Sequence, residues 1–316
     1  MEKNLDIIER SELDIPLSDV KRGDIPTVSH ESTTEEAIRL MQESRQGAMA
    51  VLKGKVAVGL ISERDLILKP DFSDPEWAKR PISDFMTAGP FSLPETSLLS
   101  DAIKLVTKRS FRQIPLTNEA GEYVSMVSIK DMLGHLVEYF PRQVGNFGVI
   151  KSWENQTVDD YSEMYSTELN GDGHLNGNIF MAHLKRVSHR RPAIVDESVS
   201  IGEVIDLIRF QKGGAVLLTR YETQLLGIIT ERDILLKAFK EGKVDPNLKA
   251  TDFMSANPDT LLRKHYIAHA INNMFHFNYR NTIVVDEDNY PLSVIGMLEL
   301  FKFVAYHFYG DEVSLL

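Results

Sequence analysis

The sequence predicts an α/β fold built from four copies of one unit, arranged as two tandem pairs. The segment 58–69, VGLISERDLILK, returns 168 residues later as 226–237, LGIITERDILLK, with seven of twelve residues identical. A weaker copy follows in each half, because SIKD at 128–131 and GMLE at 296–299 each lie 66 residues beyond the stronger tetrad. Strand and helix patterns alternate within each copy. One supersecondary unit was therefore copied, and functional clefts are expected between units.

The first unit shows the order of elements that the others repeat. A short strand at 25–28 precedes an amphipathic helix at 34–44, two strands at 48–52 and 56–61 joined by a polar turn, and a second helix at 62–69. The apolar face of the first helix recurs in later units, at Ala37, Ile38, Leu40 and Met41, at Ala102, Ile103, Leu105 and Val106, and at Val204, Ile205, Leu207 and Ile208.

The repeats divide the chain into six segments. We expect an N-terminal extension at 1–19, units at 20–80 and 81–140, a connection at 141–181, and units at 182–245 and 246–316. The connection accounts for the 36 extra residues between the second and third copies, and its tract NGDGHLNGN is rich in turn-forming residues.

The composition excludes several classes of protein. With 316 residues, of which 43% are hydrophobic, the chain can bury two ordinary cores, one for each pair of units. The absence of cysteine excludes disulfides, thiolate catalysis and cysteine-bound zinc. A net charge of −11 argues against nucleic acid and anionic membranes as partners. No apolar run reaches the roughly 18 residues of a membrane span, so we expect a soluble cytoplasmic protein.

Two motifs that could suggest metal binding lack essential ligands. His265 and His269 have the spacing of a zinc-binding helix, but HYIAH lacks the glutamate that zincins carry after the first histidine. The tract 168–179 begins like a calcium-binding loop, but Ile179 stands where a bidentate glutamate is required. The sequence also shows no serine elbow, phosphate-gripping glycine loop or carboxylate pair. We therefore expect no metal site, no catalytic cofactor and no enzyme.

The repeated motifs resemble those of a known family. The tetrads SERD, SIKD and TERD follow aliphatic strands, and DFM turns begin at Asp84 and Asp252. In this order and spacing, the chain resembles cystathionine β-synthase (CBS) domain proteins, and its two pairs are similar to the gamma subunit of AMP-activated protein kinase. The resemblance covers residues 20–308 and implies a flat pseudo-symmetric disc of four β-α-β-β-α units.

Each tetrad places a hydroxyl and a carboxylate at the start of a helix. There the carboxylate can accept two hydrogen bonds from a vicinal diol, and the helix N-terminus suits phosphate. A single S-x-x-D is more often only a helix cap, whereas three copies in register favour a ligand site. The resemblance implies that the Asp holds ribose hydroxyls. The matching residues are Ser62 and Asp65, Ser128 and Asp131, and Thr230 and Asp233. The fourth tetrad has Gly296 and Glu299 instead, so we expect that site to be empty or altered.

Basic residues supply candidate phosphate contacts. Arg112, in SFRQIPL, and Arg280, 168 positions later, stand just before a middle strand. The resemblance implies that such residues reach the phosphates of the neighbouring unit's nucleotide, so we pair Arg112 with Asp65 and Arg280 with Asp233. The alternative for each is a solvated arginine at a strand start. Three further basic residues precede the tetrad aspartates and either assist or are solvated, namely Arg64, Lys130 and Arg232.

A nucleobase requires a flat apolar slot with polar groups at its edge. The resemblance places this slot between the first strand and the strand that leads to the tetrad. The first strands offer hydroxyls at Thr27, Ser92 and Thr260, while the third unit has Val195 instead. The apolar residues near the tetrads are Ile61, Val127 and Ile229, and most such residues belong to the core.

The tract 185–191, KRVSHRR, is the strongest basic cluster in this acidic chain. It opens the third unit, near the expected centre of the disc. It could hold polyphosphate or an acidic partner, or its charges could simply be solvated.

These patterns lead to one functional hypothesis and two alternatives. We expect a non-enzymatic regulatory module that binds AMP, ADP or ATP between units, senses energy state, and signals occupancy to an unknown protein partner. The first alternative is a ligand-free scaffold for protein assembly. The second is a sensor of cyclic di-AMP or S-adenosylmethionine. A monomer and a homodimer both remain open.

Overall fold

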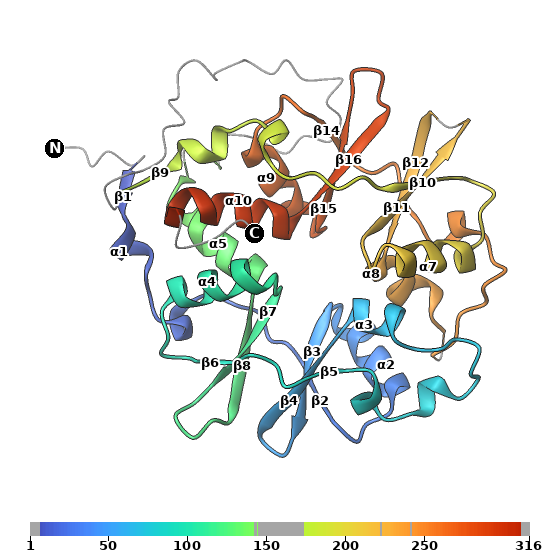
Figure 1. Ribbon diagram of the computed structural model, residues 1–316, viewed down its shortest axis with the longest axis horizontal. Coiled ribbons are helices and arrows are strands. Elements are labelled where there is room, and N and C mark those ends of the chain that lie inside the picture. The colour runs from blue at the N-terminus through green and yellow to red at the C-terminus, as the bar shows by residue number, and fades with distance from the viewer. Residues whose placement is uncertain (1–6, 142–143, 145–173, 222, 241, 311–316) are drawn as a thin grey trace.

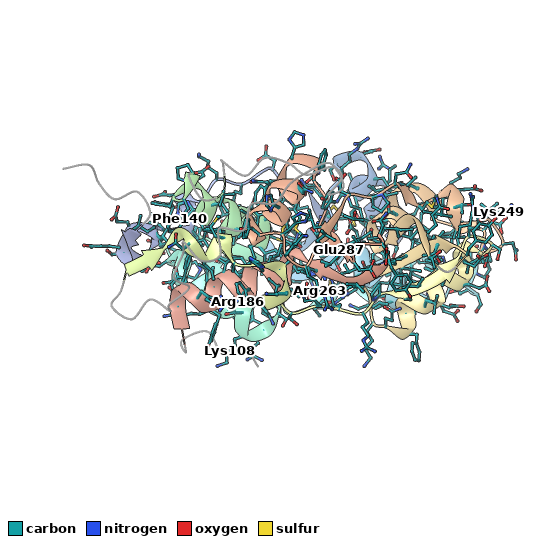
Figure 2. All side chains as sticks on the ribbon, turned by 90° about the horizontal axis from the view of Figure 1, so that it is seen from above. Lys108, Phe140, Arg186, Lys249, Arg263 and Glu287 are labelled. Atoms are coloured by element: carbon teal, nitrogen blue, oxygen red, sulfur yellow. The ribbon has the colours of Figure 1, made fainter. Side chains whose placement is uncertain are left out.

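The computed structural model describes residues 7–141, 144, 174–221, 223–240 and 242–310. Four β-α-β-β-α units form a flat disc, which is seen face-on in Figure 1 and edge-on in Figure 2. The predicted α/β fold class and the two tandem pairs are confirmed. Most of the expected connection at 141–181 and the tract 168–179 lie outside the described residues, apart from 141, 144 and 174 onward.

The first and third units have the same elements. The first contains β2 (Thr27–Ser29), α2 (Thr34–Ser44), β3 (Ala48–Lys53), β4 (Val56–Ser62), α3 (Glu63–Leu68) and β5 (Thr87–Ala88). The third contains β10 (Ala193–Asp196), α7 (Ile201–Phe210), β11 (Ala215–Arg220), β12 (Gln224–Thr230), α8 (Glu231–Asp233), a π-helix at Ile234–Ala238 and β13 (Ser255–Ala256). The short strands β5 and β13, which follow the DFM turns, add a fourth strand that sequence patterns did not indicate.

The second and fourth units have three-stranded sheets. The second contains β6 (Leu93–Pro94), α4 (Leu99–Arg109), β7 (Gln113–Thr117), β8 (Tyr123–Ser128) and α5 (Ile129–Glu138). The fourth contains β14 (Thr260–Leu262), α9 (Ile267–Phe277), β15 (Asn281–Val285), β16 (Pro291–Gly296) and α10 (Met297–Tyr309). In every unit the first strand is parallel to the second, and the second is antiparallel to the third.

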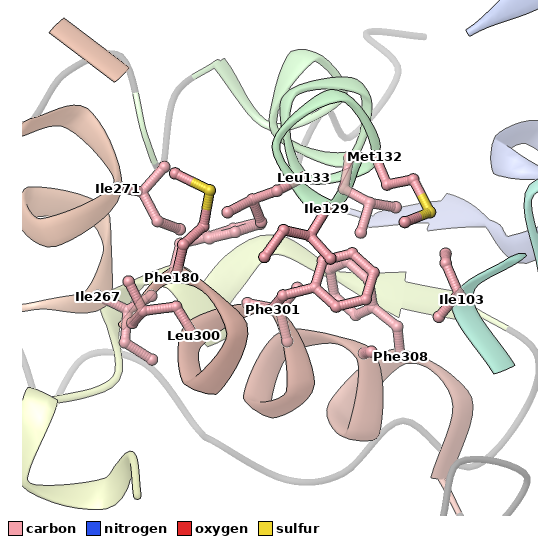
Figure 3. Packing of buried hydrophobic residues seen from close by; sticks show 14 of the residues in the cluster. Ile103, Ile129, Met132, Leu133, Phe180, Ile267, Ile271, Leu300, Phe301 and Phe308 are labelled. Atoms are coloured by element: carbon pink, nitrogen blue, oxygen red, sulfur yellow. The ribbon is translucent and has the colours of Figure 1, made fainter. Parts of the chain in front are cut away.

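Helices join the two halves of the disc. One apolar cluster combines helices of the first and third units, and another combines helices of the second and fourth. In the latter, Ile129 and Met132 of α5 face Phe301 and Phe308 of α10, and Phe180 closes one side (Figure 3). Each large core therefore spans both halves, whereas the sequence suggested one core for each pair.

The N-terminal segment packs against the second and fourth units. Strand β1 (Ile7–Glu9) pairs in antiparallel fashion with β9 (His174–Asn176), and α1 (Arg10–Leu13) follows β1. Leu13 and Leu17 are fully buried in the same cluster as α5 and α10. The described part of the extension, residues 7–19, thus belongs to the folded disc.

Candidate functional site

All three Ser/Thr-x-x-Asp tetrads form capping boxes. In the first, the Ser62 hydroxyl accepts a hydrogen bond from the Asp65 amide, and Asp65 Oδ2 accepts one from the Ser62 amide at 2.9 Å. The same bonds recur in the second and third tetrads, at 2.8 Å and 2.9 Å for the latter contact. The structural role as a helix cap is therefore real in every copy. The cap uses only Oδ2 of each carboxylate, so the three sites differ in what Oδ1 contacts.

In the first and third tetrads, the second carboxylate oxygen already has partners. Asp65 Oδ1 accepts a hydrogen bond from Thr87 at 3.0 Å and pairs with Lys69 at 2.7 Å. The equivalent contacts of Asp233 are with Ser255 at 2.8 Å and Lys237 at 2.7 Å. A diol that approaches either carboxylate must therefore share it or displace a partner.

The second tetrad differs. Asp131 Oδ2 is bound within its capping box, but within the described residues Oδ1 has no hydrogen-bond or ion-pair partner. The position four residues later, where the other tetrads have lysine, is His135. Among the three tetrads, Asp131 therefore has the carboxylate that is best prepared to accept a new donor.

A cavity of about 730 Å³ lies where the four units meet. This volume falls within the range of small-molecule sites. The lining residues come from all four units, and they include nine of the predicted site residues. These nine are Ser62, Arg64, Asp65, Arg112, Ser128, Lys130, Asp131, Arg232 and Arg280. The lining includes six Arg or Lys side chains and four carboxylates, so the cavity favours an anionic ligand even though the whole chain is acidic.

The middle residues of the two strong tetrads connect the halves. Glu63 is almost fully buried, and it pairs with Arg232 of the third unit at 3.3 Å and with Arg280 of the fourth unit at 3.0 Å. Burial is the main cause that lowers the pKa of Arg232, and Glu63 opposes this effect. In the reciprocal direction, Arg64 lies 3.6 Å from Glu231, which also accepts a hydrogen bond from the Gly214 amide.

Two glycines make room for these arginines. A Cβ atom on Gly47 would lie 2.4 Å from the Arg280 guanidinium, and one on Gly213 would lie 2.4 Å from that of Arg64. In both places, the guanidinium of one unit packs directly against the glycine backbone of another unit. No side chain larger than hydrogen fits at either place without displacing the arginine.

Arg112, Arg45 and Lys130 are the three cavity cations that form no ion pair with a carboxylate among the described residues. Protein surrounds the residue, yet its side chain is open to the cavity. Burial lowers the pKa of the Arg112 guanidinium, and Arg64 is the next largest contribution in the same direction. Within the part of the chain that the structure describes, no carboxylate pairs with Arg112. An anion in the cavity would reduce the repulsion between the positive charges of Arg112 and Arg64.

Arg280 contacts a residue that the repeat register does not assign to it. The register pairs it with Asp233, whereas in the structure it lines the same cavity as Asp65 and Arg112 and donates a hydrogen bond to Glu63. The 168-residue register assigns each arginine to its own pair, whereas at the centre of the disc an arginine of the fourth unit reaches the first. Thr230 and Asp233 do not line this cavity.

The expected nucleobase contacts also require correction. Thr27 and Ser92 are exposed and do not line the cavity, and Thr260 is buried in its sheet. The apolar residues expected beside the tetrads are fully buried core, namely Ile61, Val127 and Ile229. Residues that precede the first strands line the cavity instead, namely Gly23, Ile25, Gly89, Pro90 and Phe91. The aromatic residues before Arg112 and Arg280 also line it, and their 168-residue spacing was a signal that could have identified them.

The strand register shows that the counterpart of Thr27 in the second half is not the residue 168 positions later. Thr27 pairs with Ala50, and Ile194 pairs with Leu217, where Ala50 and Leu217 are each the third residue of their strand. Ile194, not Val195, is therefore the counterpart of Thr27. The cause is the connection between β11 and β12, which is one residue longer than that between β3 and β4.

The fourth tetrad has an internal partner. Glu299 Oε2 accepts a hydrogen bond from the Gly296 amide at 2.9 Å, and Oε1 lies 3.3 Å from Arg190. Arg190 also donates to Asn281 at 3.2 Å. It comes from the basic tract 185–191, whose Lys185, Arg186 and Arg191 are exposed. The tract is therefore not one uniform basic surface.

His265 and His269 act as backbone acceptors. Nδ1 of His265 accepts from the Leu262 amide at 2.8 Å, and Nδ1 of His269 accepts from the Tyr266 amide at 3.1 Å. Among the described residues, no group of three His, Cys, Asp or Glu side chains could hold a metal ion. Burial lowers the pKa of each histidine to about 4.

The family model for the CBS domain matches residues 17–70, 82–138 and 184–239, which together exceed half of the chain. Each match contains one Ser/Thr-x-x-Asp tetrad. The chain belongs to the CBS domain family. Its fourth CBS unit, outside these matches, is evident from the fold. Among the helices of the described residues, none combines the length and apolarity needed to cross a membrane.

Relatives support this assignment over most of the chain. The CBS domain-containing protein CBSCBSPB5 from Arabidopsis thaliana is 22% identical over 283 residues, which cover 87% of this chain and 50% of that protein. The meiotically up-regulated gene 70 protein from Schizosaccharomyces pombe is 20% identical over 304 residues, covering 87% of this chain and 41% of that protein. The chain thus spans about half the length of the curated relatives it matches first.

Two solved structures share the fold over almost the whole chain. Protein MJ1225 from Methanocaldococcus jannaschii, described as a proposed archaeal homologue of g-AMPK, has a TM-score of 0.66 at 16% identity. The match covers 94% of this chain and 99% of that one. An uncharacterized conserved protein from Pyrococcus horikoshii has a TM-score of 0.53 at 15% identity and is 98% covered. At these identities, the likeness concerns the fold.

Proposed function

We propose that this CBS chain is a non-enzymatic regulatory module that binds an adenine nucleotide in its central cavity. The observation that carries the proposal is the convergence of two Ser-x-x-Asp carboxylates and six basic side chains on one cavity of about 730 Å³. A ligand that suits this lining has a vicinal diol for a carboxylate, an anionic group for the cations, and a flat apolar part. A nucleotide has all three.

Asp131 is the proposed main anchor for the ribose. Its free Oδ1 can accept a hydrogen bond from a ribose hydroxyl without breaking an existing contact, whereas Asp65 must first release Thr87 or Lys69. Arg112 is the proposed main phosphate contact because it lines the cavity, protein surrounds it, and its neighbours Arg64, Arg190 and Arg280 are also cations. Phe91 and Phe111, whose ring centroids are 5.5 Å apart, supply apolar surface at the cavity wall.

The proposed signal is a change in how the two halves hold each other. Arg64, Arg232 and Arg280 line the cavity, and each pairs with a glutamate of another unit. A phosphate group in the cavity competes with these glutamates for the same guanidinium groups. Occupancy would thereby alter the contacts between halves, and a protein partner that binds both halves would respond to that change.

Calorimetric titration with AMP, ADP and ATP tests the proposal. Asp131→Ala removes an acceptor whose charge-assisted bonds are each worth about 1.5–3 kcal/mol, so affinity should fall at least about tenfold. Arg112→Met removes the guanidinium but keeps an unbranched apolar side chain, and it should weaken binding of ATP more than binding of AMP. Glu119→Ala, which removes an exposed carboxylate of the same unit, is the matched control and should bind as the unaltered chain does.

Native mass spectrometry of the purified protein separates the alternatives. Co-purified AMP, ADP or ATP supports the proposal. Co-purified cyclic di-AMP or S-adenosylmethionine, bound in the same molar ratio, supports a sensor of that compound instead. If the protein carries no small molecule and none of these compounds binds in titration, the cavity is not a ligand site, and the scaffold function remains. Unchanged ATP affinity in Asp131→Ala would reject the ribose assignment alone.

A further inference from the structure

Arg190 and Gly23 occupy equivalent positions in the two halves of the disc. Strand register makes Thr27 and Ile194 equivalent, and Gly23 and Arg190 each stand four residues earlier. Gly23 lines the central cavity, which Asp131 also lines. Arg190 contacts Glu299, the counterpart of Asp131 in the fourth unit. The same place beside a tetrad is thus without a side chain in one half and holds a guanidinium in the other.

The space around Gly23 is open, whereas the space beside the fourth tetrad is filled. A Cβ atom on Gly23 would meet no atom within 4 Å, so this place is open. Beside the fourth tetrad, a Cβ atom on Gly296 would lie 2.4 Å from Glu299 Oε2 and 2.6 Å from Arg190 Nη2. A serine like that of the second tetrad would therefore require the Glu299 carboxylate and the Arg190 guanidinium to shift. Glycine, the longer glutamate and the arginine are therefore mutually adapted.

We propose that Arg190 is a built-in occupant of the fourth cleft, and that it takes the place which a nucleoside diol would take beside Asp131. Its guanidinium forms an ion pair with the Glu299 carboxylate, whose counterpart Asp131 is the proposed ribose acceptor. Position 23, or 190 in the second half, thus decides which clefts admit a ligand. The binding part of this inference rests on the proposed nucleotide function, whereas the ion pair that closes the cleft does not.

A reciprocal exchange of three residues tests the inference. The opened variant carries Arg190→Gly, Gly296→Ser and Glu299→Asp, which reproduce the second tetrad and its glycine. The closed variant carries Gly23→Arg, Ser128→Gly and Asp131→Glu, which reproduce the fourth. With ATP and AMP as probes in native mass spectrometry, the opened variant should hold one nucleotide more than the unaltered chain. The closed variant should hold one fewer. Arg191→Gly, at an exposed neighbour, is the control and should change nothing.

A ligand-free measurement separates the failure of this inference from failure of the proposed function. Arg190→Ala, Glu299→Ala and the double variant are compared by melting temperature. If Arg190 and Glu299 act as one unit, the double variant melts no lower than the worse single variant. Additive losses would overturn the built-in occupant, and so would an opened variant that melts cooperatively but retains the original nucleotide count. An unaltered chain that binds no nucleotide would reject the proposed function, and the melting comparison would then decide the inference.

Discussion

Replacing Glu63 by glutamine should be among the most damaging single changes at the centre of the disc. The carboxylate is 8% exposed and faces two arginines, Arg232 at 3.3 Å and Arg280 at 3.0 Å. Glutamine keeps the shape but removes the charge, so two guanidinium groups remain close together without their shared counter-ion. Breaking a buried pair in this way costs about 3–5 kcal/mol, whereas an exposed pair contributes at most about 1 kcal/mol.

The exposure of the two arginines sets the expected magnitude between these limits. The Arg232 side chain is 20% exposed and that of Arg280 is 40% exposed, so water in the cavity solvates both in part. We therefore expect Glu63→Gln to lower the free energy of unfolding by about 2–3 kcal/mol. For a chain of this size, such a loss corresponds to a melting temperature lower by roughly 3–5 °C.

Urea and thermal denaturation, followed by circular dichroism, measure this loss. Glu31→Gln is the control, because the Glu31 side chain is 83% exposed. A cycle that combines Glu63→Gln with Arg280→Met should show a coupling energy above about 0.5 kcal/mol, since the two residues share one contact. If Glu63→Gln loses no more than the control, the glutamate does not hold the halves together, and the proposed competition with phosphate has no physical basis.

Two further predictions concern the fourth and third units. His265 and His269 have a pKa of about 4 in the folded protein against about 6.5 when unfolded. Their contribution to the free energy of unfolding is therefore complete above pH 6.5 and is lost as the pH falls towards 4. His265→Asn should reduce the slope of stability against pH in this window, and an unchanged slope would contradict the burial argument. Gly202→Ala should destabilise the chain by about 1–3 kcal/mol, because the new Cβ would lie 2.9 Å from the Pro246 carbonyl oxygen; Gly23→Ala, whose Cβ meets nothing within 4 Å, is its control in the same denaturation series and should be neutral.

The elements of the fold could be predicted because each follows from local pattern. The helix expected at 34–44 is present as Thr34–Ser44, and the tetrads cap helices as their hydroxyl and carboxylate spacing indicated. What could not be predicted is which unit packs on which. The hydrophobic period identifies a buried face of a helix but not its partner, so the cores shared between halves were missed.

The same limit explains the errors at the candidate site. Nine predicted residues line the cavity because the tetrads and basic positions repeat in register. The ion pair of Arg280 with Glu63 was not predicted because it crosses between halves. Glu63 was overlooked as a site residue because a glutamate in a first helical turn also suits the helix dipole. The Arg190 contact depends on a tract outside the tetrads and has no signal in the repeat.

Each half of the chain carries both members of the pair that joins the halves. Glu63 precedes Arg64 just as Glu231 precedes Arg232, and each glutamate meets the arginine of the other half. Such a surface is self-complementary, and it has the isologous form that two identical subunits use. One half alone could therefore pair with a second copy of itself. In two identical subunits, equivalent positions must carry the same residue. When both halves belong to one chain, equivalent positions can differ, as Gly23 and Arg190 do.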